Sequence, residues 1–322
     1  MQQDYTYAVA RIRFRETKLL SDADIASLNA APDEGAAMRL LRDKGWGDNT
    51  ADLDAEELLA SEREKLWDFI GEVIPEKEAF SFLNVPNDYH NLKVAVKCVI
   101  RDIKPEGLFL YNAPTDPDAL YEALKMRDYE ALPEHLRELG KDATSVLLQT
   151  SDGQLCDIVI DKACMEHIRR LGKEAENEIV QKYCELFVAS ADIKIAVRSA
   201  KTGKSIDFIR RAMAECDTLD AQKLAQAASL SCSDIIAYLS TTEYSSAVEA
   251  ISTSMSAFEK WCDDHLTALL RSQKWEPFGF GPVVAYILAR ENEIKAVRLI
   301  LSAKHNGIPE EIVKERLRKM YA

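Results

Sequence analysis

The stretch DIKIAVR, residues 192–198, has two similar counterparts elsewhere in the chain, and this repetition is the main indication of the fold. The others are NLKVAVK at 91–97 and EIKAVR at 293–298. Each block has a polar or acidic residue, then Leu or Ile, then a lysine, then an apolar stretch that ends in a cation. The lysines recur at intervals of 101 residues, as Lys93, Lys194 and Lys295. One copy is an ordinary turn of amphipathic helix, but three at one interval predict a triplicated unit of about a hundred residues, large enough for a small core.

Helical patterns around the three blocks support the same division of the chain. Residues 25–46 and 224–244 both show a helix, a short break with helix-capping residues, a second helix and an aromatic stop. The middle part of the chain has a shorter counterpart around Leu120–Leu124. A further helical run precedes each lysine block, at 58–70, 156–171 and 258–270.

Helix-breaking residues separate the three units. Residues 203–207 mark the second junction. The first junction contains Pro105, Gly107, Pro114 and Pro117. We therefore expect an all-α fold of three similar helical domains, at 1–112, 113–208 and 209–322.

The last unit contains the clearest helix, from Pro282 to Lys304. Its apolar stripe consists of Ile287, Ile294, Val297 and Leu301. On the opposite face, Glu291 and Lys295 stand at i, i+4 with the acid first, which predicts an ion pair. Gly307 is expected to cap this helix, and Pro309 to open a terminal helix over residues 308–321.

The segment SVLLQTSDGQLCDIVID, residues 145–161, leaves two structures open. Asp152 and Gly153 stand between apolar runs, which is typical of a β-hairpin turn. However, apolar residues continue at helical spacing from Ile158 to Leu171. We therefore expect a helix, with Asp152 and Gly153 in a turn just before it.

Gly203-Lys204-Ser205 resembles the end of a phosphate-binding loop. The complete motif needs another glycine five positions before Gly203, and Arg198 stands there. A charged, alanine-rich run precedes the motif where a buried strand is required. We therefore expect Gly203 to be the left-handed cap of a helix, with no nucleotide or other cofactor bound.

Composition excludes several classes of function. The chain has 322 residues, 30% of them charged, and its net charge of -13 disfavours nonspecific binding to nucleic acid. The longest clearly apolar run, 283–289, is far shorter than the roughly twenty residues that cross a bilayer. The start of the chain lacks a signal-peptide pattern, so we expect a cytosolic protein whose seven cysteines are reduced. Cys164 and His167 share a helix face, but two candidate ligands do not predict a metal site.

The N-terminal stretch YAVARIRFRETKLLSDADIASL, residues 7–28, resembles the start of the C subunit of bacterial and archaeal V-type (A-type) rotary ATPases, which is similar to the d subunit of the vacuolar enzyme. The blocks at 87–97 and 291–317 resemble two further recurring blocks of that family. Trp46 stands where the family usually has a tyrosine. The residues that match at the N-terminus are Tyr7, Ala10, Arg11, Arg13, Glu16, Leu19 and Leu20.

The resemblance implies a funnel of three helical domains around a pseudo-threefold axis. It implies one copy per complex, on the cytoplasmic face of a membrane rotor ring, with central-stalk subunits D and F in the socket. Such a protein transmits torque and has no catalytic residues. Lys93, Lys194 and Lys295 are candidates for contacts with these partners, although intramolecular ion pairs explain them more simply. A free-standing helical scaffold and an enzyme with a dispersed site remain the other interpretations of the sequence.

Overall fold

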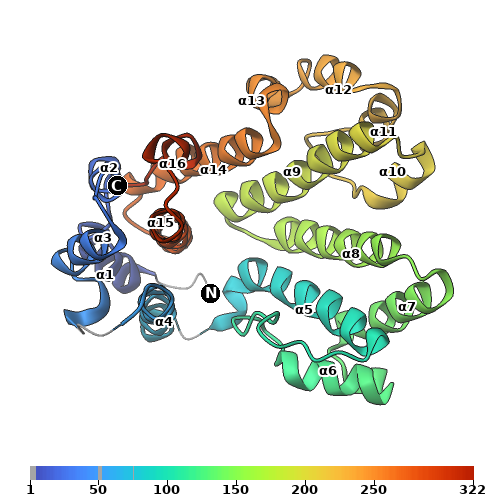
Figure 1. The fold of residues 1–322 in the computed structure, drawn as a ribbon, viewed down its shortest axis with the longest axis horizontal. Coiled ribbons are helices and arrows are strands. Elements are labelled where there is room, and N and C mark those ends of the chain that lie inside the picture. Colours follow the sequence, from blue (N-terminus) through green and yellow to red (C-terminus); the bar gives the residue numbers. More distant parts are fainter. Residues whose placement is uncertain (1–4, 50–52, 75) are drawn as a thin grey trace. The chain divides into compact units, whose positions relative to one another are not determined.

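The computed structural model describes residues 5–49, 53–74 and 76–322, and all regular structure in these ranges is helical (Figure 1). The prediction of an all-α fold is confirmed. The helices are α1 (Thr6–Glu16), α2 (Asp22–Asn29), α3 (Glu34–Asp43), η1 (Trp46–Asn49), α4 (Ala55–Val73), η2 (Lys77–Phe80), α5 (Ser81–Arg101), α6 (Pro117–Met126), η3 (Tyr129–Ala131), α7 (Glu134–Thr150), α8 (Gly153–Glu174), α9 (Glu178–Thr202), α10 (Ile206–Ala212), α11 (Ala221–Leu230), α12 (Cys232–Leu239), η4 (Glu243–Ala247), α13 (Val248–Thr253), α14 (Met255–Arg271), η5 (Ser272–Trp275), α15 (Gly281–His305) and α16 (Glu310–Arg316).

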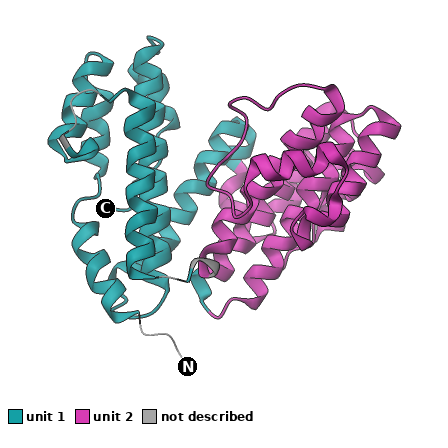
Figure 2. Cartoon of the chain, turned by 90° about the horizontal axis from the view of Figure 1, so that it is seen from below, with its two compact units in different colours: residues 1–77, 177–179, 249–322 teal, residues 78–176, 180–248 magenta. Residues whose placement is uncertain are grey.

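The chain divides into two compact units (Figure 2). Unit 1 consists of Met1–Lys77, Asn177–Ile179 and Glu249–Ala322, and unit 2 of Glu78–Glu176 and Val180–Val248. The two ends of the chain therefore fold together in unit 1. The division into three domains stays a prediction.

Helix α15 organises unit 1. Helices α1, α2, α3, α4, α14 and α16 all contact it. Its second half, with Ile294, Val297 and Leu301, forms one hydrophobic core with Leu28 of α2 and Leu41 of α3. The helix pair α2–α3 therefore buries its apolar faces against the last long helix of the chain.

Unit 2 contains the helices from α5 to α12, and both near and more distant helices along the chain pack together in it. Helix α5 contacts α6, α7 and α8, and α7 also contacts α8. Helix α10 lies against α8 and α11, and α11 lies against α12 (Figure 1).

The first residue of each repeated block has the same structural role. Asn91, Asp192 and Glu293 lie on α5, α9 and α15, and each is at most 1% exposed. A side-chain oxygen of each one accepts a hydrogen bond from the backbone N–H of a residue in a connecting segment. Each of these segments precedes another helix. The donors are Leu110 before α6 at 2.8 Å, Ala214 before α11 at 3.2 Å and Leu20 before α2 at 2.6 Å. The sequence repeat is thus a structural repeat at this position.

The local predictions about helix ends are confirmed. Gly203 and Gly307 have φ values of 63° and 64°. The N–H of the next residue bonds five residues back in each case, Lys204 to Ser199 and Ile308 to Ala303, which satisfies a free carbonyl at the helix end. The segment 153–174 is helical, and Asp152 caps it by accepting the N–H groups of Gln154 and Leu155.

Two predictions for the last unit are wrong in detail. Glu291 bonds to Arg63 of α4 at 3.2 Å, whereas Lys295 is exposed to solvent. The terminal helix begins after Pro309 but ends at Arg316. The tail after Arg316 is not helical, and side chains from elsewhere bind its backbone: Asp22 accepts the N–H of Met320 at 2.9 Å. Packing of the buried Met320 outweighs the helical pattern there.

Candidate functional site

The three repeated lysines lie in three different environments. Lys93 of α5 is half-buried and forms an ion pair with Asp161 of α8 at 2.6 Å. Lys194 of α9 is also half-buried, whereas Lys295 of α15 is exposed, and neither has an ion-pair partner within the described ranges. Lys93 and Lys194 belong to unit 2, and Lys295 belongs to unit 1. A role for any of them in binding partners stays a prediction.

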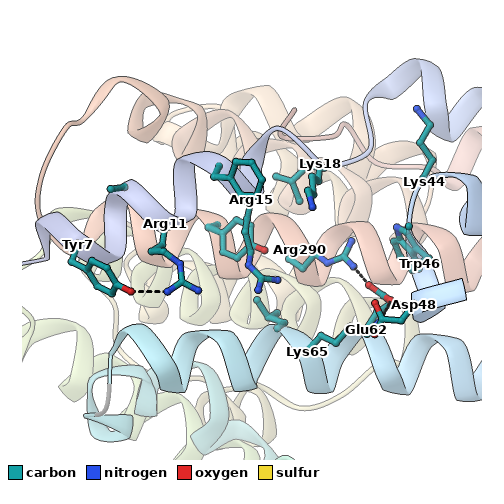
Figure 3. A pocket seen from close by; sticks show the side chains of 16 residues that line it. Tyr7, Arg11, Arg15, Lys18, Lys44, Trp46, Asp48, Glu62, Lys65 and Arg290 are labelled. Atoms are coloured by element: carbon teal, nitrogen blue, oxygen red, sulfur yellow. Dashed lines mark hydrogen bonds and ion pairs between the residues drawn. The ribbon is translucent and has the colours of Figure 1, made fainter.

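Unit 1 contains a cavity of about 520 Å³ whose lining is strongly basic (Figure 3). The lining comes from α1 and the residues after it, from residues 44–48, and from α4 and α15. Two carboxylates, Asp48 and Glu62, face it together with six cations. The cations are Arg11, Arg15, Lys18, Lys44, Lys65 and Arg290. In a chain of net charge -13, this cavity is a local concentration of positive charge.

Helix α1 supplies one wall because its two faces differ. Ala8, Val9 and Ile12 are buried at 3% exposure or less, which fixes the helix against the rest of unit 1. The opposite face carries Tyr7 and Phe14, which are 62% and 66% exposed. Cations alternate with these aromatic rings at helical spacing. The outer face of α1 therefore combines aromatic and basic side chains.

A left-handed turn forms the second wall. Gly47 has a φ of 76°, and a Cβ atom built there would lie 2.8 Å from Leu58, so a larger residue does not fit. The turn aims the N–H of Gly47 at Glu62, which accepts it at 2.9 Å. It also places Trp46, which is 2% exposed, beneath the guanidinium of Arg290 at 4.5 Å.

An ionic network around two buried carboxylates, Glu62 and Glu293, forms the base of the cavity. Arg290 of α15 pairs with Glu62 of α4 and with Glu293 of its own helix. Glu62 is 4% exposed and also accepts a bond from Lys65 at 2.8 Å, and Lys65 reaches Asp48 at the same distance. The pKa of Glu293 is raised, because the effect of burial is larger than the opposing effect of the Arg290 guanidinium. Because each member has charged partners, the network holds α4 and α15 in one register.

Arg15 and Lys18 differ from the other cations of the cavity. Arg11 and Lys44 pair with Glu72 and Asp24, outside the cavity lining. Across residues 5–49, 53–74 and 76–322, no carboxylate pairs with Arg15 or Lys18. Arg15 instead lies over the ring of Phe69 at 4.0 Å, and Lys18 lies 5.1 Å from the ring centre of Phe14. These two cations thus lie against aromatic rings and have no carboxylate partner in the described part of the chain.

The chemistry of this cavity is that of anion binding. Arginine and lysine donate to carboxylate or phosphate oxygens, and aromatic walls contact apolar groups. Within the described part of the chain, no three His, Cys, Asp or Glu side chains gather so as to hold a metal ion. The arrangement can recognise a negatively charged group.

A second polar cluster lies in unit 2 around Asp88, which is fully buried. Asp88 accepts the N–H of Thr115 at 2.9 Å and lies 3.2 Å from Nε2 of His135. The hydroxyl of Tyr89 lies 2.9 Å from Nδ1 of His167. Burial, together with Arg170 and His135, lowers the pKa of His167 to about 4. His167 is thus held by a tyrosine, and its helix neighbour Cys164 is a buried thiol.

Sequence reasoning about function did not single out the basic cavity. A signal was present in the sequence, because Arg11, Arg15 and Lys18 recur at the helical spacing i, i+4 and i+7, although α1 itself ends at Glu16. The residues that carried the family resemblance include four that line the cavity, Tyr7, Ala10, Arg11 and Leu19. What the sequence could not indicate is that 44–48, α4 and α15 complete the site.

The sequence has relatives among known proteins over most of its length. The chain is similar to the C subunit of the V-type sodium ATPase of Enterococcus hirae, with 24% identity over 84% of each chain. It is also similar to the C subunit of the A-type ATP synthase of Desulfurococcus sp. (strain SY), with 23% identity over 97% of this chain and 90% of that protein. The C subunit of the A-type ATP synthase of Thermococcus kodakarensis is likewise similar, with 21% identity over 97% of this chain and 89% of that protein.

Among the described helices, none combines the length and the apolar character needed to cross a bilayer. The sequence matches the family of ATP synthase (C/AC39) subunits over residues 8–316, which is nearly the whole chain. The chain belongs to this family of ATP synthase (C/AC39) subunits.

Proposed function

We propose that this chain is the non-catalytic central-stalk protein that couples the D–F shaft of a V-type or A-type ATPase to its membrane rotor ring. The observation that carries the proposal is the family match over residues 8–316. The chain stands once in each complex, as a funnel of three helical domains on the cytoplasmic side of the membrane. It thereby takes part in ion transport without hydrolysing ATP itself.

Stiffness supports this role, because a torque adaptor must not yield between its two partners. The long helices α5, α9 and α15 have 21, 25 and 25 residues. Each carries a buried polar side chain, Asn91, Asp192 or Glu293, that ties a connecting segment to it. Close-packed helices with such ties transmit strain with little compression.

The net charge of the chain favours attachment to the complex through protein partners rather than through lipid. The net charge of -13 is repelled by an anionic lipid surface. Affinity for the ring and the stalk must therefore come from specific protein interfaces. Two interfaces that survive torque are expected to bury well over about 1,000 Å² in total.

Reconstitution without this chain tests the proposal. Complexes with and without it are assembled in vesicles, and ATP hydrolysis and ion movement are measured in the same sample. We expect hydrolysis by the soluble head to persist without the chain, while ion movement stops. Adding back the purified chain should restore coupling.

Two outcomes contradict the proposal. Ion transport that stays coupled to hydrolysis without the chain would mean that no adaptor is missing. A chain that binds neither a D–F pair nor a detergent-held rotor ring, but captures an unrelated protein, would be a free-standing scaffold instead.

A further inference from the structure

We propose that the basic cavity of unit 1 and the outer face of α1 bind an acidic protein segment of another member of the complex, one that carries carboxylates beside an apolar side chain. The inference deepens the proposed function, because it rests on this chain being part of a multi-protein complex. It specifies the location of one interface and the chemical groups that the partner presents there.

Arg15 and Lys18 carry charges that a negative partner can neutralise. The other four cations of the cavity already have carboxylates within 3.3 Å. Arg15 and Lys18 have none among the residues that the structure describes, yet each is held against an aromatic ring. A carboxylate that enters here meets donors that are already positioned, which lowers the entropy cost of binding.

The neighbouring aromatic side chains point to a protein partner. Tyr7 and Phe14 are 62% and 66% exposed and flank Arg11 on the same face of α1. Large exposed aromatic rings next to arginine are the composition of interaction hot spots in protein interfaces. A small anion would satisfy Arg15 and Lys18 but would leave both rings in water. Nucleic acid would satisfy the cations, but its continuous phosphate charge would extend beyond this basic patch over a protein of net charge -13, whereas a short acidic segment need only meet the patch itself.

The dimensions suit side chains rather than a whole helix. The cavity of about 520 Å³ is of the size that receives a few side chains or a small molecule. Its base is rigid, since Arg290 is fixed by Glu62 and Glu293 and lies on Trp46. The partner's carboxylates therefore enter the cavity, and its apolar side chain covers Phe14 at the rim.

Zero-length cross-linking tests which group reaches Lys18. The intact complex is purified through a tag on this chain and treated with a water-soluble carbodiimide. This reagent joins the Lys18 amine to a carboxylate in direct contact as an amide, and is itself converted to its urea. We expect mass spectrometry to find Lys18 joined to an Asp or Glu of another protein of the complex. Cross-links of Lys18 confined to this chain's own carboxylates would overturn the inference.

Binding of variants measures the contribution of the surface. Wild-type chain, Lys18→Glu and Phe14→Ser are each added to complexes that lack this chain. Lys18→Glu places like charges together, so we expect binding at least about tenfold weaker. Phe14→Ser removes the exposed ring, and we expect a loss of similar size. Both positions are exposed, and thermal unfolding should show that both variants fold.

Lys314→Glu is the matched control, because Lys314 is an exposed lysine of unit 1 that does not line the cavity. Its binding should stay within about twofold of wild type. If wild-type chain does not bind the depleted complex, the proposed function fails. If wild type binds and both cavity variants bind equally well, only the present inference fails. Loss of binding by Lys18→Glu alone, with inorganic phosphate competing for the site, would assign the cavity to a small anion.

Discussion

Glu293 accepts a hydrogen bond of 2.6 Å from the backbone N–H of Leu20, 273 residues earlier in the chain. The same side chain binds Arg290, which in turn binds Glu62 of α4. One buried carboxylate thus joins the last long helix to the start of the chain and to the base of the basic cavity. Asn91 and Asp192 make the equivalent bonds on α5 and α9.

Replacing Glu293 by Ala should strongly destabilise the protein. The change leaves the N–H of Leu20 without its acceptor and removes one of the two carboxylates of buried Arg290. Breaking a buried pair in this way costs about 3–5 kcal/mol of unfolding free energy. Denaturant unfolding measures the loss. Glu56→Ala, which breaks an exposed pair with Arg298, is the control and should cost under about 1 kcal/mol.

Replacing Asp192 by Asn should stabilise the protein most at neutral and higher pH. Burial raises the pKa of Asp192 from 3.8 to about 7. The folded state therefore prefers the protonated acid, so wild-type stability falls as the pH rises from about 4 to 7. Asn has no such charge and can still accept the N–H of Ala214. The difference in unfolding free energy between variant and wild type should grow over this range, and a constant difference would contradict the assignment.

His167 should make the protein sensitive to mild acid. Burial is the main cause that lowers its pKa from 6.5 to about 4. The unfolded state therefore takes up the proton first, and stability is lost as the pH falls from about 6.5 to 4. His167→Gln can keep a hydrogen bond to Tyr89 without this titration. The midpoint of thermal unfolding should fall less steeply with acid in the variant than in the wild type.

Replacing Lys93 by Met should change little. Its pair with Asp161 is partly exposed on both sides, at 26% and 50% of the side chains. Pairs of this kind contribute under about 1 kcal/mol to stability. Met in place of Lys194 or Lys295 should likewise leave unfolding and stalk binding near wild type. A large loss of stalk binding from one substitution would identify that lysine as an interface residue.

Lys204 should have no role in binding nucleotide. Its amine donates to Gln154 at 2.8 Å and lies 4.7 Å from the ring centre of Phe208, while Gly203 serves as a helix cap. Calorimetry of the isolated chain with ATP should show no binding, and Lys204→Ala should leave complex activity near wild type. Micromolar affinity that disappears in the variant would restore the phosphate-loop hypothesis.

The helices and some of their ends were predictable because their signals are local. Gly203 and Gly307 cap helices since only glycine adopts positive φ without strain, and Asp152 starts α8 through its own oxygen. The end of the last helix was not predictable. Residues after Arg316 continue a helical pattern, but Asp22 and Asp264, far away in the sequence, bind their backbone instead.

The functional residues of the cavity were only partly predictable. Arg11 is among the residues that carry the family resemblance, whereas Arg15, Lys18 and Arg290 are not. The charges on α1 follow a helical spacing that occurs on many solvated helices. Only their position opposite Glu62 and Arg290 distinguishes them from an ordinary polar face.

Local sequence patterns were enough to predict the all-helical fold, the helix ends at Asp152, Gly203 and Gly307, and the repeat at 91, 192 and 293, because periodicity and capping act over a few residues. Tertiary structure alone decided that α2 and α3 pack on α15, and that α1, residues 44–48, α4 and α15 enclose a basic cavity. The physical reason is that apolar helix faces are nearly interchangeable in sequence. Their partners are selected by packing and by buried bonds such as that of Glu293 to Leu20, which join residues at opposite ends of the chain.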